Sequence, residues 1–154
     1  MEAKKIIISN KEITFLYIIF FVGIVGHLYD PLRNLMLLLT PATLLLTGLI
    51  VLFYSYKSSS NNFLLWAAFT YIVTFILEVV GVKTGLIFGE YNYGSTLGIK
   101  LFDVPLIIGF NWVFVILGSI VISRLITSNI FLSSIISAFI AFIFDLILEP
   151  IAIK

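Results

Sequence analysis

Five long apolar runs, separated by short polar links, constrain this chain more than any other feature of its sequence. A helix needs ~20 apolar residues to cross the hydrocarbon core of a bilayer. Four of the runs qualify, and the first is marginal. The predicted spans are Ile13–Leu28, Leu35–Tyr54, Phe63–Val82, Val104–Ser123 and Ile130–Leu148. Short links favour antiparallel neighbours. The expected fold class is all-α, a polytopic transmembrane helical bundle that forms one transmembrane domain over residues 1–154.

The composition agrees with a membrane location. Of the 154 residues, 61% are hydrophobic and only 11% are charged, which is too few to cover a soluble domain. The net charge of +1 indicates neither nucleic acid nor an acidic partner. The chain has no Cys, and His27 is its single histidine. We therefore expect no metal and no cofactor, and any chemistry must depend on carboxylates, hydroxyls and tyrosines.

The first run follows basic residues, as a signal peptide would, but it ends without a small-x-small cleavage signature, so we expect a membrane anchor. Cations on the two sides number five against four, which predicts a cytoplasmic N-terminus. The expected location is a prokaryotic cytoplasmic membrane. On the N-terminal side lie Lys4, Lys5, Lys11, Lys57 and Arg124; on the other side lie Arg33, Lys83, Lys100 and Lys154.

Ionisable residues inside the spans are the first functional candidates, because each is costly in lipid. Glu78 lies near the end of the third span and Asp145 near the end of the fifth, with Glu149 just beyond. Since the spans alternate in direction, these carboxylates fall on one membrane face. The same face receives His27, Asp30, Arg33, Asn34 and Asp103. The sequence thus predicts a one-sided polar pocket, with Glu149 at a helix end or kink because Pro150 follows it.

Helical spacing groups further polar residues with these carboxylates. Tyr71, Thr74 and Glu78 follow the i, i+3, i+7 pattern of one helix face. In the fifth span, a face of small residues suits close packing and would turn Asp145 inward; it comprises Ser134, Ser137, Ala138 and Ala141. Asn111 and Trp112 of the fourth span extend the predicted polar lining.

The connection from Lys83 to Phe102 differs from the other links. Gly85, Gly89, Gly94 and Gly98 oppose a stable helix, and the aromatic residues Phe88, Tyr91 and Tyr93 suit a membrane interface. We predict an irregular or re-entrant segment on the face of the carboxylates. Long loops in compact proteins are often functional, so a lid over an amphiphile-binding pocket is the favoured interpretation. An inert interfacial linker is the alternative.

Three groups of motifs resemble the carotenoid biosynthesis membrane-protein family, which includes the CruF-type carotenoid hydratases. The resemblance covers residues 71–154, about half of the chain. It rests on Glu78-x-x-Gly81-x-x-Thr84-Gly85-x-x-Phe88-Gly89-x-Tyr91-x-Tyr93, on Leu97-Gly98, Val104-Pro105-Leu106 and Asn111-Trp112, and on Asp145-x-x-x-Glu149-Pro150-x-Ala152. Members usually continue into further spans, whereas this sequence stops at Lys154, so the resemblance implies a short or truncated member.

The resemblance implies acid-catalysed addition of water to the terminal isoprene double bond of an acyclic carotenoid, a lyase-class reaction. A desolvated carboxyl can protonate the alkene, and a second carboxylate can stabilise the tertiary cation and orient water. Asp145 is assigned as the acid, with Glu78 and Glu149 as stabiliser and water-positioning base. Substrate-binding residues are expected to be Tyr71, Thr74, Thr84, Tyr91, Tyr93, Asn111 and Trp112. Tyr91 and Tyr93 would cover the cation or the polyene end.

Three other functions remain open from the sequence. In a carotene cyclase, an internal double bond would capture the same cation in place of water. A proton-coupled transporter or channel subunit could use the carboxylates as relays, although they cluster on one side. A non-catalytic scaffold for carotenoid enzymes is the third. The expected partners are a carotenoid, the lipid bilayer and other membrane enzymes of the pathway, and no nucleic acid.

Overall fold

The computed structural model describes residues 10–59, 62–87, 89 and 91–152, without the side chains of residues 148–152. Its helices are α1 (Asn10–Leu28), α2 (Asp30–Ser58), α3 (Phe63–Thr84), α4 (Leu106–Ile126) and α5 (Ile130–Ala152). All five are long and apolar enough to cross a membrane. The predicted all-α helical bundle is confirmed, and the chain is a multi-pass membrane protein.

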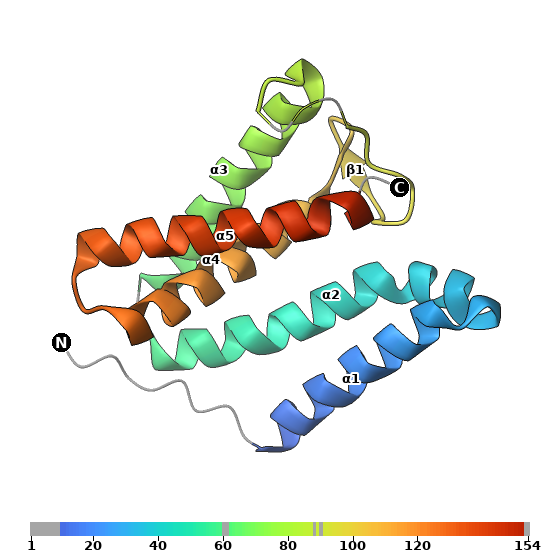
Figure 1. Ribbon diagram of the computed structural model, residues 1–154, viewed down its shortest axis with the longest axis horizontal. Coiled ribbons are helices and arrows are strands. Elements are labelled where there is room, and N and C mark those ends of the chain that lie inside the picture. The colour runs from blue at the N-terminus through green and yellow to red at the C-terminus, as the bar shows by residue number, and fades with distance from the viewer. Residues whose placement is uncertain (1–9, 60–61, 88, 90, 153–154) are drawn as a thin grey trace.

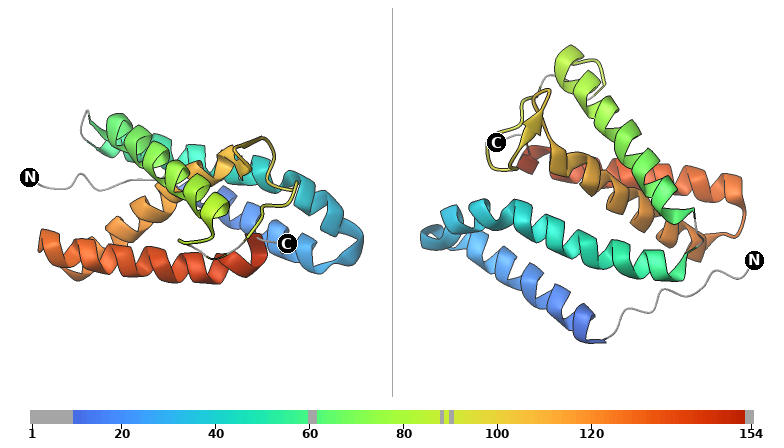
Figure 2. Two further views of the ribbon diagram at one scale, coloured as in Figure 1. Left: turned by 90° about the horizontal axis from the view of Figure 1, so that it is seen from above. Right: turned by 180° about the vertical axis from the view of Figure 1, so that it is seen from behind.

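Helix α4 is the central element of the bundle. It packs against α2, α3 and α5, whereas α1 packs on α2 at the periphery (Figures 1 and 2). Small residues allow these close approaches. A Cβ atom added at Gly48 of α2 would lie 2.1 Å from the Phe114 ring, and one added at Gly109 would lie 3.1 Å from Tyr71. The hydrophobic core of Phe75, Val104 and Ile108 lies where α3 meets the start of α4.

The second helix is longer at both ends than the predicted span Leu35–Tyr54. It begins at Asp30, so that Tyr29 alone separates it from α1. The sequence prediction treated residues 29–33 as a link because they contain a proline and charges. Pro31 instead lies in the first turn of α2, where a missing N–H leaves no hydrogen bond unmade and the fixed φ suits a helix.

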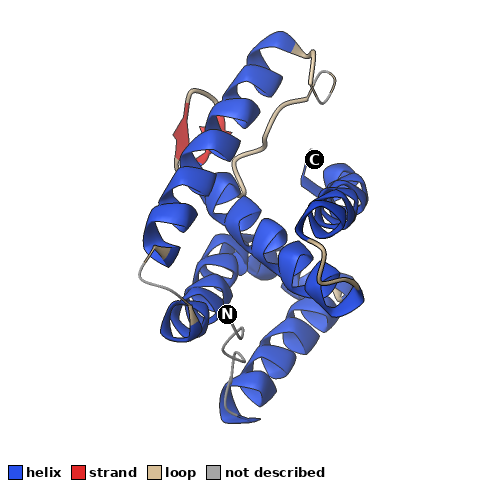
Figure 3. Cartoon of the chain, turned by 90° about the vertical axis from the view of Figure 1, so that its left-hand side faces the viewer, coloured by secondary structure: helices blue, strands red, loops and turns tan. Residues whose placement is uncertain are grey.

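The predicted irregular segment between the third and fourth helices is confirmed, and it also contains a small hairpin (Figure 3). Helix α3 ends at Gly85, which adopts the left-handed conformation with φ 66°. Strands β1 (Lys100–Leu101) and β2 (Val104–Pro105) pair antiparallel through a turn at Phe102 and Asp103, with φ values of 54° and 69°. Helix α4 therefore begins at Leu106, two residues later than predicted.

The fifth helix continues to Ala152, through Glu149 and Pro150. Glu149, predicted at a helix end or kink, lies in the last turn of this helix. A proline removes only its own N–H from the helix ladder, and close to a helix end the remaining bonds can keep the segment helical. The Glu149 side chain, like the Phe88 residue of the loop motif, lies outside the described part of the chain.

Candidate functional site

The Glu78 carboxylate lies at the centre of the candidate site. Its residue is only 4% exposed, and three aromatic side chains donate hydrogen bonds to it. The Tyr91 and Tyr93 hydroxyls reach the same oxygen, Oε2, at 2.6 and 2.8 Å. The Trp112 indole N–H reaches Oε1 at 2.7 Å. We call Tyr91, Tyr93 and Trp112 the aromatic cage of Glu78. Such short bonds are typical of an ionised carboxylate, and they hold it in one orientation.

The two tyrosines act as donors because their own ionisation is suppressed. Burial raises the pKa of Tyr91 above its ordinary value, and the hydrogen bond to Glu78 raises it further. Burial and the charge of Glu78 likewise raise the pKa of Tyr93. The two rings meet edge to face, with centroids 5.4 Å apart. Both hydroxyls therefore remain protonated and aimed at the carboxylate over the ordinary pH range.

Backbone geometry after α3 delivers these tyrosines to Glu78. The chain leaves the helix at Gly85 and turns again at Gly89 and Gly98, with φ values of 81° and 84°. Glycine adopts such values without steric cost. The Lys100 ammonium donates to the Tyr93 carbonyl, and the hairpin then returns the chain into α4. The loop thus covers the end of α3 from the side of the carboxylate.

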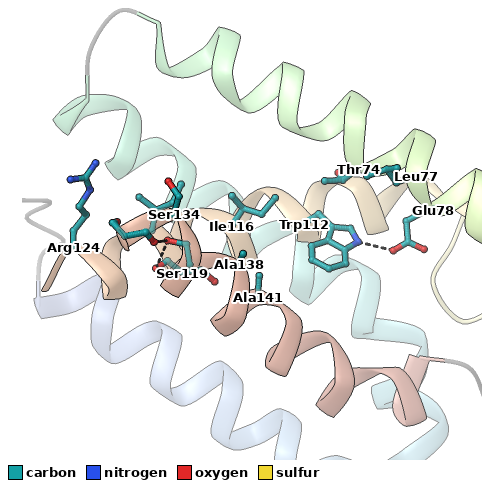
Figure 4. A pocket seen from close by; sticks show the side chains of 13 residues that line it. Thr74, Leu77, Glu78, Trp112, Ile116, Ser119, Arg124, Ser134, Ala138 and Ala141 are labelled. Atoms are coloured by element: carbon teal, nitrogen blue, oxygen red, sulfur yellow. Dashed lines mark hydrogen bonds between the residues drawn. The ribbon is translucent and has the colours of Figure 1, made fainter. Parts of the chain in front are cut away.

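An apolar groove of about 520 Å³ runs away from the cage between α3, α4 and α5. Figure 4 shows Glu78 with Trp112 at one end and Arg124 at the other. Trp112 and Arg124 are twelve positions apart on α4, which corresponds to about 18 Å along the helix. The groove is lined by Thr74, Leu77, Glu78, Trp112, Ile116, Ser119, Ile120, Arg124, Ser133, Ser134, Ser137, Ala138 and Ala141.

Asp145 lies near the cage end of this groove. The groove-lining residues Ser134, Ala138 and Ala141 follow one face of α5, and Asp145 is four positions beyond Ala141 on the same face. Its side chain is half-buried. The charge of Asp145 also contributes to the raised pKa of Tyr91. Asp145 is therefore within electrostatic reach of the Glu78 cage.

The structure brings together some of the predicted substrate-binding residues and leaves others apart. Thr74 lines the groove beside Glu78. The Tyr71 hydroxyl instead donates to the Leu106 carbonyl at 3.0 Å, and its ring packs over the start of α4. The Thr84 hydroxyl donates to the carbonyl one turn back on α3, at 2.7 Å. Asn111 is half-buried next to Trp112 but is not part of the groove lining.

The far end of the groove was not predicted from the sequence. Ser119, Ser133 and Ser137 line it together with Arg124. Around them, the hydroxyls of Ser123 and Ser133 are 2.7 Å apart and those of Ser123 and Ser137 are 2.8 Å apart, which fastens α4 to α5. The sequence feature that points to this end of the groove is the small-residue face of α5, which is also typical of close helix packing. Within the described ranges, no group of three His, Asp or Glu residues is arranged to hold a metal ion.

Comparison with known proteins assigns a family to this chain. No curated protein and no solved structure matches it. The family profile described as carotenoid biosynthesis protein matches residues 39–154, which is most of the chain and includes the cage, the loop and the whole groove. The match extends the resemblance of residues 71–154 back into the second helix. The chain therefore belongs to the carotenoid biosynthesis protein family.

Proposed function

We propose that this protein catalyses the addition of water to the terminal isoprene double bond of an acyclic carotenoid. The observation that carries the proposal is the buried Glu78 carboxylate, held by three donors at one end of an apolar groove. A hydrocarbon chain in the groove would present its end to a fixed negative charge and to aromatic faces. Both stabilise a developing carbocation.

The chemistry needs one proton donor and one water molecule. The Asp145 carboxyl gives a proton to the CH carbon of the terminal double bond, which leaves a tertiary cation on the carbon that bears two methyl groups. Water adds to this cation, and its surplus proton passes to a carboxylate. The product is a tertiary alcohol. Asp145 supplies the acid because both oxygens of Glu78 already accept hydrogen bonds.

Glu78 takes the role of the electrostatic stabiliser in this scheme. A preorganised charge needs no rearrangement as the cation forms, so its effect is larger than that of a mobile group. Glu149, four positions after Asp145 on α5, is the proposed base that receives the proton of the added water. Thr74, Tyr91, Tyr93 and Trp112 are the proposed contacts of the substrate end. We propose only a supporting role around that end for Tyr71, Thr84 and Asn111.

A carotene cyclase is the second candidate, and one observation favours it. The groove next to the cage is walled largely by Leu77, Ile116, Ile120 and the alanines of α5, which would keep water out. With water excluded, an internal double bond of the substrate would capture the same cation. A proton-coupled transporter fits less well, because Glu78 and Asp145 lie toward one end of the groove and Arg124 occupies the other.

We also propose a location and a membrane orientation for the enzyme. We place it in a prokaryotic cytoplasmic membrane as one transmembrane domain, with the N-terminus in the cytoplasm and other membrane enzymes of the pathway supplying the substrate. Under this orientation the Glu78 cage faces the outer side of the membrane.

The deciding experiment is co-expression with a lycopene-producing pathway, followed by mass analysis of the pigments. A gain of one water per reacted end supports the hydratase, and an isomer of unchanged mass supports the cyclase. Asp145→Asn should abolish either product, because a general acid contributes about 10²–10⁴-fold. Asp103→Asn is the matched control, since this exposed residue has a positive φ that asparagine also tolerates. Unchanged pigments with the unmodified protein would refute both enzymatic proposals.

A further inference from the structure

Three of the four groove serines have hydroxyls bonded to their own helix, and the Ser133 hydroxyl is bonded to that of Ser123 on α4. The Ser119 hydroxyl donates to the Val115 carbonyl at 2.7 Å, and the Ser134 hydroxyl donates to the Ile130 carbonyl at 3.0 Å. The Ser137 hydroxyl donates to the backbone carbonyl of Ser133 at 2.8 Å. A hydroxyl that is bonded to its own helix presents mainly its methylene group to a ligand. The part of the groove that these serines line is therefore suited to a hydrocarbon.

The shape of the groove is linear. Its floor consists of Trp112, Ile116 and Ile120, which lie at i, i+4 and i+8 along α4 and so form a row parallel to the helix axis. The wall on α3 is formed by Thr74 and Leu77. A straight row of about 12 Å between Trp112 and Ile120 accommodates an extended chain rather than a ring system.

The wall on α5 consists of the smallest side chains in the groove. Ala138 is exposed and Ala141 is half-buried, and both line the groove opposite α3 (Figure 4). In most of α5 the other positions carry Phe, Ile or Leu. Because α4 is covered by α3 on one side and α5 on the other, a large residue at either alanine would occupy the space between them.

The groove also has an open side within the membrane-spanning part of the bundle. Helices α3 and α5 each pack extensively on α4, but in the described part of the chain they scarcely contact one another (Figure 3). A hydrophobic molecule dissolved in the bilayer can reach the groove through this gap without crossing the polar loop.

We infer that Ala138 and Ala141 determine which substrates the enzyme accepts. They keep open a straight apolar groove along α4. The linear chain of the substrate enters this groove sideways from the bilayer and places its reacting end at Glu78. This inference rests on the proposed function for the identity of the reacting end, but the binding of a linear polyene is testable by itself.

Trp112 provides the binding signal, since the chain has two tryptophans and only Trp112 lines the groove. The full chain with Trp66→Phe, reconstituted in vesicles, is titrated with phytofluene, an acyclic carotenoid whose short conjugated segment absorbs where tryptophan emits. We expect efficient quenching of Trp112. The reciprocal variant, Trp112→Phe, leaves only Trp66, which does not line the groove, and should be quenched less.

Ala141→Phe and Ala138→Phe, each in the Trp66→Phe background, should raise the phytofluene concentration for half-quenching by about tenfold or more, a loss of ~1.4 kcal/mol in binding. Ile143→Phe, at a lipid-exposed position of α5, is the size-matched control and should leave quenching unchanged. Ala141→Ser keeps a small side chain and should also bind normally, which separates filling of the groove from general damage to α5.

Equal quenching in Ala141→Phe and Ile143→Phe would overturn the inference. So would a loss of quenching in Ala141→Ser as severe as that in Ala141→Phe. The two proposals fail separately. Normal quenching without any pigment product would refute the catalytic proposal and leave the groove assignment intact. Pigment conversion with quenching that is insensitive to Ala138→Phe and Ala141→Phe would refute the groove assignment alone.

Discussion

Trp112 and Glu78, 34 positions apart in the sequence, are joined by a hydrogen bond of 2.7 Å from the indole N–H to Oε1 across the interface of α3 and α4. The two tyrosines of the loop occupy the other oxygen. The carboxylate is thereby tied to α4 on one side and to the loop on the other. The two tyrosine bonds can be removed by Tyr→Phe without changing the apolar bulk around them.

Trp112→Phe removes the donor to Oε1 and keeps an aromatic ring in the groove. A buried charged group that loses one hydrogen bond costs about 1–3 kcal/mol. The same loss of transition-state stabilisation lowers the reaction rate about 5- to 150-fold, so we expect a clearly lower product yield in the pigment assay, with membrane insertion retained. Trp66→Phe is the matched control, because Trp66 packs against Phe63 and does not line the groove. Equal yields from the two variants would show that the indole N–H does not matter for the reaction.

Tyr91→Phe and Tyr93→Phe each remove one donor from Oε2. Because both hydroxyls share this oxygen, their effects on stability should not be additive. We expect each single variant to lose about 1–3 kcal/mol, and the double variant to differ measurably from the sum. Thermal unfolding in detergent measures the three changes. Tyr17→Phe, at a position 74% exposed, is the control and should have almost no effect. Strict additivity would argue against a shared bond acceptor.

The raised pKa values of Tyr91 and Tyr93 predict how the stability of the protein changes at alkaline pH. Their pKa values are raised in the folded protein, so below the unfolded pKa of ~10 their contribution to stability is complete. As the pH rises above that value, the unfolded chain loses these protons first and folding weakens. Each tyrosine contributes a slope of up to about 1.4 kcal/mol per pH unit. The protein should therefore lose stability above pH ~10 more steeply than the Tyr91→Phe, Tyr93→Phe double variant; parallel losses would contradict the predicted burial of the two hydroxyls.

A substitution at Gly48 tests the close contact between α2 and α4. A Cβ atom there would lie 2.1 Å from one atom of Phe114 and 2.8 Å from Phe110, whose rings pack edge to face. Gly48→Ala should destabilise the protein by about 1–3 kcal/mol through overpacking. Gly118→Ala is the control on α4: no atom would lie within 4 Å of its Cβ, so it should be neutral or slightly stabilising. Thermal unfolding distinguishes the two. A neutral Gly48→Ala would show that the helices do not approach as closely as described.

The orientation can be measured with cysteine labels, since the chain contains no cysteine of its own. Ser128 lies in the link between α4 and α5, and Ile99 lies in the loop that carries the cage tyrosines. Each is replaced by cysteine in a separate variant. Both positions are exposed. A membrane-impermeant maleimide applied to intact cells should label Ile99→Cys and spare Ser128→Cys. The reverse pattern would place the N-terminus outside the cytoplasm.

The sequence by itself determined the membrane spans and the irregular loop, and it made Glu78 a candidate functional residue. These follow from one-dimensional properties: the length of an apolar run, the frequency of glycine, and the cost of a charge in lipid. The sequence could not show that α2 begins at Asp30 or that α5 continues through Pro150, because helix ends depend on the balance of a few hydrogen bonds in the last turn.

Only the tertiary structure decided which polar side chains meet. Tyr71 shares a helical stripe with Glu78, yet its hydroxyl is bonded to the Leu106 carbonyl, whereas Tyr91, Tyr93 and Trp112 reach the carboxylate from 13, 15 and 34 positions away. Spacing along one helix specifies a face, but the rotation of each helix against its neighbours specifies what that face contacts. That rotation follows from packing between elements, here the small residues Gly48 and Gly109 beneath large rings, and from a loop whose path depends on three glycines with positive φ.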